Sequence, residues 1–133
     1  MKPIQSVMTD LIAEAWADEV GLWMIISQLR RECGITDPTQ LRAATLDFVQ
    51  KLLDSGEVVA GYYSVDGNGI AAWDLPTSDV VSRISAEWDK LGREPNIGDI
   101  VVFVGGSQEG GSQLREEKEE DYLFPQIRPI NET

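Results

Sequence analysis

Apolar residues in the first quarter of the chain recur at the spacing of amphipathic helices. They are Ile4, Val7, Met8, Leu11, Ile12 and Ala15 in one stretch, and Leu22, Ile25, Ile26 and Leu29 in the next. This period predicts two helices within residues 4–33, with Gly34 as a stop after the second. Asp18 and Gly21 favour a break between the two helices, although one long bent helix fits the same pattern.

A third helical segment carries clear signals at both of its ends. Asp37 is a suitable N-cap, Pro38 fits the first helical position, and Gly56 marks the end. The apolar stripe between these signals consists of Leu41, Thr45, Phe48, Val49, Leu52 and Leu53. The sequence therefore predicts a helix that begins at Pro38 and ends before Gly56.

Branched residues and turn signals predict a β-hairpin after this helix. "EVVAGYY" and "IAAWDL" flank "SVDGNG", whose Asp-Gly and Asn-Gly pairs tolerate positive φ. Beyond Pro76, Ser78 is the expected cap of a fourth helix that closes at "KLGREP". Its expected inner face consists of Val81, Ile84, Ala86 or Glu87, and Trp88. A last strand is expected in "IGDIVVFVG", which ends near Gly105.

This order of elements predicts an α+β, winged-helix-like domain over residues 1–104. It comprises three N-terminal helices, a β-hairpin, a fourth helix and a final strand. Residues 105–133 change in composition, because Gly-Gly-Ser occurs twice and the charge run "LREEKEED" follows. We expect these residues to form a flexible C-terminal tail, made of a Gly/Ser/acidic linker and a candidate docking peptide.

The apolar cluster in this tail is too dense for an inert segment. Its members are Tyr122, Leu123, Phe124, Ile127 and Ile130. The prolines between them lower the entropy that such a peptide loses on binding. The segment fits a native docking peptide, a peptide ligand over residues 122–130 tethered by an artificial linker, or a segment that packs back on the domain's own sheet.

Negative charge runs along the whole chain. Residues 1–104 hold 16 Asp/Glu and 8 Lys/Arg, residues 105–133 hold 7 and 3, and the net charge is −12. Such a surface repels polyanions and speeds the encounter with basic proteins. The longest apolar run, "GLWMII", is far below the ~20 residues of a membrane span, and no secretory signal pattern is present. We expect a cytoplasmic, bacterial-type protein with no membrane partner.

The third helix would read DNA in a winged-helix regulator, but its charge does not suit that role. Its basic and acidic residues are Arg42, Lys51, Asp47 and Asp54. The hairpin tip has Asp66 and no cation, while Arg30 and Arg31 close a helix, where cations favour the dipole. A protein that lacks phosphate contacts loses orders of magnitude in affinity for duplex DNA. No nucleic-acid partner is expected.

The residue types that carry common enzymatic chemistry are scarce. The chain has no histidine and a single cysteine, Cys33, which excludes an internal disulfide and a Cys/His zinc site. Neither "GNGIAAW" nor "VGGSQEGG" is followed by the Lys-Ser/Thr pair of a phosphate-binding loop. Cys33 is expected to pack inside a helix. We therefore expect no catalytic residue, no cofactor and no metal site.

Aromatic residues are the better candidates for function. Trp23, Trp73 and Trp88 lie in apolar stretches and are expected in the core. Trp16, and one of Tyr62 and Tyr63, are expected to be exposed, because neighbours on a strand point to opposite faces. An exposed Trp surrounded by acids is a typical protein-binding anchor. The candidate partner-binding residues are Trp16, Tyr63, Asp66, Asp79, Tyr122, Leu123, Phe124 and Ile127.

Residues 20–104 resemble a group of small bacterial winged-helix-like proteins of unknown function. Their shared motif falls here on Trp88, Leu91, Gly92, Pro95, Ile97, Gly98, Asp99, Ile100 and Phe103. The resemblance departs at Val102, where a Trp is expected, which puts in doubt any binding role of that Trp. Some members resemble immunity proteins encoded beside bacterial toxins. The resemblance therefore implies a protein partner, and the acidic surface agrees with a basic toxin.

The leading hypothesis is a non-enzymatic, acidic protein-binding domain, in its sharpest form an immunity-type inhibitor of a basic toxin. One alternative is a winged-helix transcription regulator that binds DNA through the third helix. The other is a domain that carries the tethered peptide ligand 122–130. The sequence leaves the oligomeric state open.

Overall fold

The computed structural model describes residues 1–106, and the structure is an α+β domain, as predicted. Its elements are α1 (Ile4–Ala17), β1 (Val20–Gly21), α2 (Leu22–Cys33), α3 (Pro38–Asp54), β2 (Val58–Tyr63), β3 (Ile70–Ala72), α4 (Thr77–Leu91) and β4 (Val102–Gly105). The candidate residues Tyr122, Leu123, Phe124 and Ile127 lie outside the described residues. No described helix combines the length and the apolar character needed to cross a membrane.

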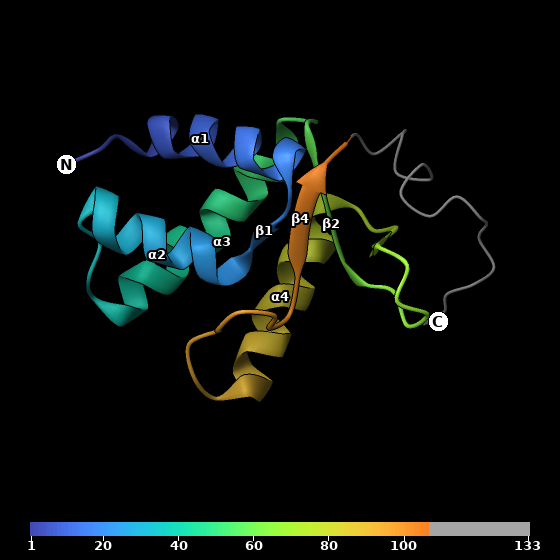
Figure 1. The fold of residues 1–133 in the computed structure, drawn as a ribbon. Coiled ribbons are helices and arrows are strands. Elements are labelled where there is room, and N and C mark those ends of the chain that lie inside the picture. Colours follow the sequence, from blue (N-terminus) through green and yellow to red (C-terminus); the bar gives the residue numbers. More distant parts are fainter. Residues whose placement is uncertain (107–133) are drawn as a thin grey trace.

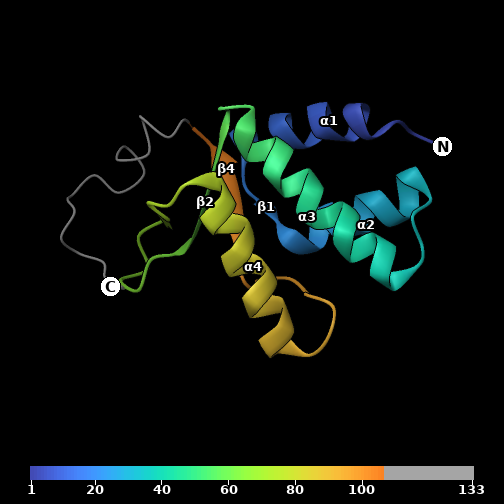
Figure 2. The same ribbon diagram turned by 180° about the vertical axis from the view of Figure 1, so that it is seen from behind.

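The four strands form one antiparallel sheet in the order β1-β4-β2-β3. The last strand of the chain therefore lies between β1 and the hairpin, with Phe103 opposite both Val20 and Ala60. Figure 1 shows α1, α2 and α3 grouped on one side of the strands, and Figure 2, which views the domain from behind, shows α4 in front of the strands. Strand β2 thus has a neighbour on both sides and is not half of an isolated two-stranded wing.

The core lies between the helices and one face of this sheet. Val58, Ala60 and Phe103 belong to it, together with apolar residues from all four helices. Val59 and Val102 are also buried but lie outside this cluster. This split follows from the two-residue period of a strand, which sends neighbours to opposite faces.

The break between the first two helices occurs as predicted, and the bent-helix alternative is wrong. Helix α1 ends at Ala17, and the chain then forms the short strand β1, which the sequence pattern did not predict. Val20 and Gly21 pair with Phe103 and Val102, some eighty positions along the chain. Two residues are too few to show the alternating pattern of a strand. These residues form a strand only because they pair with β4.

The third helix matches its prediction closely. It begins at Pro38, and the Asp37 carboxylate accepts the N–H of Gln40 at 3.0 Å. Five of the six residues in its predicted stripe are buried, and Leu53 is half-buried. The predicted hairpin is confirmed as the antiparallel pair of β2 and β3, whereas the predictions for the fourth helix and the last strand need correction.

Helix α4 begins two residues earlier than predicted, because its N-cap is Pro76 and no side chain caps it. Ser78 is therefore not the cap. Val80, Ile84 and Trp88 are the buried residues of this helix, whereas Val81 is half-buried and Ala86 is exposed. Strand β4 begins only at Val102, because the preceding residues form a turn in which Ile97 is exposed.

Replacement of the cap by Asp37→Ala should lower the free energy of unfolding by about 1 kcal/mol, because the Gln40 N–H loses its acceptor. The matched control is Ser78→Ala, which should change stability by clearly less, since Ser78 makes no cap bond. Urea unfolding followed by circular dichroism measures both. Equal losses in the two variants would contradict this assignment of the caps.

Candidate protein-binding groove

A groove of about 950 Å³ runs between α1 and α3. Its apolar lining consists of Ile4, Met8, Ile12, Ala13, Trp16, Ala44 and Phe48, and its polar lining of Gln5, Thr9, Asp47, Lys51, Ser55 and Glu57. Seven of these thirteen residues are apolar, and a concave surface with apolar side chains beside polar groups can hold a ligand or a peptide. The groove is therefore the principal candidate site in the described part of the chain.

The groove arises because α1 has a wider apolar face than the core can cover. Val7, Leu11 and Ala15 point into the core. A second row at intervals of four residues, Ile4, Met8, Ile12 and Trp16, follows beside it and lines the groove. Ile4 was expected on the inner face, but 45% of its surface is exposed. The width of this apolar stripe is the feature of the sequence that could have indicated a groove.

Trp16 lies at the C-terminal end of α1 and is 60% exposed, as expected. Its indole packs directly on the backbone of Gly105 in β4, so that a methyl group added at Gly105 would overlap the ring. One part of the indole is thus fixed by the end of the sheet, while the rest faces solvent. A large apolar side chain that is already held in place loses little entropy when a partner covers it.

Carboxylates outnumber cations around this end of the groove. Six of the sixteen Asp/Glu side chains in residues 1–106 form ion pairs with cations of the same range, which leaves ten that do not. Among these ten, Glu57 lines the groove, and Asp18 and Glu19 directly follow α1. The surroundings of Trp16 therefore carry negative charge that favours a basic partner.

Most cations of the described part already form ion pairs within the domain. Six of its eight Lys/Arg side chains form ion pairs with carboxylates. On α3, Arg42 contacts Asp89 at 2.9 Å and also lies over the Trp88 ring, while Lys51 pairs with Asp47. Both cations of the helix that would read DNA are thus bound within the domain.

Tyr63 is 44% exposed, but its hydroxyl is not free to bind a partner. Tyr62 is exposed to a similar degree, and its hydroxyl donates to the carbonyl of Gly98. The Tyr63 hydroxyl donates to the Glu19 carboxylate, which lies just before β1. Because β4 lies between β1 and β2, the Tyr63 side chain reaches across β4 on the face that carries Val102. This bond, aided by burial, raises the pKa of Tyr63 to about 12.

The other candidate residues lie apart from Trp16 along the chain and in different elements. Asp66 is at the hairpin tip, where its carboxylate accepts the Ser64 hydroxyl and the Asn68 N–H. These bonds hold the pKa of Asp66 below its usual value, so the carboxylate serves the turn. Asp79 is exposed in the first turn of α4, where an acid favours the helix dipole. Of the predicted residues in residues 1–106, Trp16 alone lines the groove.

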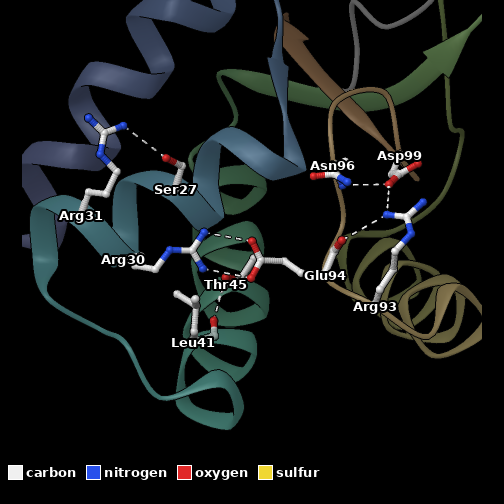
Figure 3. A network of polar contacts seen from close by, with 9 residues as sticks. All are labelled: Ser27, Arg30, Arg31, Leu41, Thr45, Arg93, Glu94, Asn96 and Asp99. Carbon is white, nitrogen blue, oxygen red and sulfur yellow. Dashed lines mark hydrogen bonds and ion pairs between the residues drawn. The ribbon is translucent and has the colours of Figure 1, made fainter.

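The motif that carried the family resemblance forms the connection from α4 to β4 (Figure 3). The Asp99 carboxylate accepts the Asn96 N–H and the Arg93 guanidinium, both at 2.8 Å, and these bonds lower its pKa. Arg30 of α2 donates two hydrogen bonds of 2.9 Å to Glu94, which ties the connection to the helices. Of the motif residues, Gly92, Pro95, Ile97, Gly98, Asp99 and Ile100 lie in this connection, while Trp88 and Leu91 lie in α4 and Phe103 in β4. None of the motif residues lines the groove.

Neither a metal site nor a reactive thiol is evident in residues 1–106. No group of three His, Cys, Asp or Glu side chains in this range is placed to hold a metal ion, and Cys33 is buried. No protein-family model, curated protein or solved structure matches the chain. The winged-helix resemblance therefore stays a prediction, and the site rests on its own geometry.

Glu19→Gln should lower the pKa of Tyr63 from about 12 towards its ordinary 10.0, because the charged acceptor is lost. The folded protein favours the neutral phenol, because its pKa is higher there than in the unfolded chain. The bond therefore adds to the free energy of unfolding below pH 10, and this contribution is lost as the pH rises to about 12. Between these limits, near-ultraviolet absorbance should show about one phenolate fewer in the wild type than in Glu19→Gln. The same difference should vanish in a Tyr63→Phe background. Identical titrations would contradict the bond.

Gly105→Ala should displace the Trp16 indole, because the new methyl group takes the space of the ring. We expect Trp16 fluorescence to shift to longer wavelength and to be quenched more readily by acrylamide. The same substitution in a Trp16→Phe background is the control, since it isolates Trp16 from the other three tryptophans. A spectrum that Gly105→Ala leaves unaltered would show that the ring is not seated there.

Proposed function

We propose that the protein is a winged-helix-like, non-enzymatic domain that binds another protein through the α1–α3 groove. The observation that carries this proposal is Trp16, an exposed indole fixed on Gly105 at one end of an apolar groove. Tryptophans in such positions dominate the binding energy of many interfaces. The partner inserts an apolar segment between α1 and α3.

The proposed partner is basic. The net charge of −12 and the unpaired carboxylates near Trp16 speed the encounter with a cationic protein and raise its dependence on salt. The sharpest form of the proposal is an immunity-type inhibitor that covers a basic toxin. Engagement of Arg42 and Lys51 within the domain disfavours the alternative of a DNA-binding regulator, because phosphate contacts would have to replace those ion pairs.

Trp16→Ala should weaken binding of peptides selected on the wild-type protein from a random display library. We expect a loss of about 2 kcal/mol or more, roughly thirtyfold in affinity, with little change in stability because the indole is mostly exposed. The selected peptides should combine aromatic or aliphatic anchors with Lys or Arg. Fluorescence anisotropy at two salt concentrations measures affinity and its charge dependence.

The matched control is Val65→Ala, which truncates a fully exposed apolar side chain at the hairpin tip, away from the groove lining. It should leave affinity unchanged. Random duplex DNA, added at low salt in the same assay, should produce no complex. Peptides that bind Trp16→Ala as well as the wild type would refute the groove as the site, and tight binding of the duplex would favour the regulator.

A further inference from the structure

The α1–α3 groove is the apolar surface that lacks cover among the described residues. Ile4 is 45% and Trp16 60% exposed at its two ends, and Ile12 is half-buried between them. The face of the sheet away from the core differs, because its valines Val59 and Val102 are only 4% and 2% exposed. An apolar segment can therefore bury its side chains against exposed apolar residues in the groove, whereas these valines of the sheet offer almost no exposed surface.

The chain leaves the described domain at the Trp16 end of this groove. The Gly105 backbone lies under the Trp16 indole, and the Gly106 N–H donates to the Glu57 carbonyl at 3.0 Å. Trp16 and Glu57 both line the groove. The described chain consequently ends, at Gly106, beside the surface that needs cover.

The following chain is long enough to reach the whole groove. Fifteen residues, 107–121, separate Gly106 from Tyr122, and they are rich in Gly, Ser and charge. By the scaling for Gly-rich chains, fifteen residues have a root-mean-square end-to-end distance of about 20–23 Å, and repulsion between like charges makes a charged chain of this length longer. Helix α1, with 14 residues, is about 21 Å long. A tether whose span matches the distance gives the attached segment an effective concentration of about millimolar.

We propose that residues 122–130 of the same chain occupy the α1–α3 groove. The segment brings five large apolar side chains, and its prolines limit the entropy lost on docking. Its one charged residue, Arg128, supplies a cation for Glu57, which has no ion pair with the cations of residues 1–106.

The test is a paramagnetic label in the full chain. Gln126→Cys is labelled with a nitroxide in a Cys33→Ser background, which leaves one thiol. The NMR signals of the Trp16 indole and the Ile4 and Ile12 methyl groups should broaden and recover when the nitroxide is reduced. The Ile97 methyl group, in the exposed turn before β4, should stay sharp (Figure 1).

Leu123→Ser with Phe124→Ser should abolish this broadening, whereas the control pair Asn131→Ser and Thr133→Ala should preserve it. Broadening on the outer face of the sheet, or none, overturns the proposal. A mixed sample tests for docking between two copies: one chain is isotope-labelled and carries no nitroxide, and the other is unlabelled and carries the nitroxide. Broadening in this sample would show that a second copy occupies the groove, which also overturns the proposal.

A second readout needs no cysteine change. Acrylamide should quench Trp16 more readily in the Leu123→Ser, Phe124→Ser chain than in the wild type, and equal quenching contradicts the proposal. The inference goes beyond the proposed function, and the two fail separately. Selected peptides that depend on Trp16 support the groove even where the tail does not dock, whereas broadening without any outside ligand supports the tail alone.

Discussion

The pairing of β4 between β1 and β2 is the constraint on which the rest of the molecule depends. Strand β4, the last strand of the domain, pairs with residues 20–21 on one side and with residues 58–61 on the other. Phe103 in this strand is fully buried. The same strand ends in Gly105, whose bare backbone seats the Trp16 indole at the end of α1. Packing in the core and the geometry of the groove are therefore linked through four residues.

The charged side chains also connect parts of the domain that are far apart in the sequence. Most cations of the described part bind carboxylates or lie over aromatic rings, and they tie helices and turns together, as Arg42 does for α3 and α4 and Arg30 for α2 and the turn before β4. In residues 1–106, which hold 16 Asp/Glu and 8 Lys/Arg, no Asp or Glu side chain is buried. Such ion pairs each contribute little to stability at an exposed surface. In the function proposed above, their larger effect is on recognition, because they leave few cations for a polyanion and many acids for a basic protein.

Local signals in the sequence predicted much of this fold. Asp37 and Pro38 define the start of α3, and Asp-Gly and Asn-Gly define the hairpin turn, since each acts within a few residues. The strand β1 could not be predicted because only its pairing with β4 makes it a strand. The groove was missed for a related reason: Ile4 and Ile12 fit a core-facing stripe equally well, and only the place where α3 meets α1 leaves them outside. Trp16 was predicted to be exposed because acids surround it in the sequence, whereas the other three tryptophans lie in apolar stretches.

In the proposed function, the surface between α1 and α3 recognises apolar segments of basic proteins. Chemical-shift mapping by NMR, with an amphipathic cationic peptide titrated into the full chain, tests it most directly. The account predicts that the largest shifts follow the residues that line the groove, with the Trp16 indole foremost. Shifts concentrated at the hairpin tip or around Arg42, or an unperturbed spectrum at saturating peptide, would contradict it.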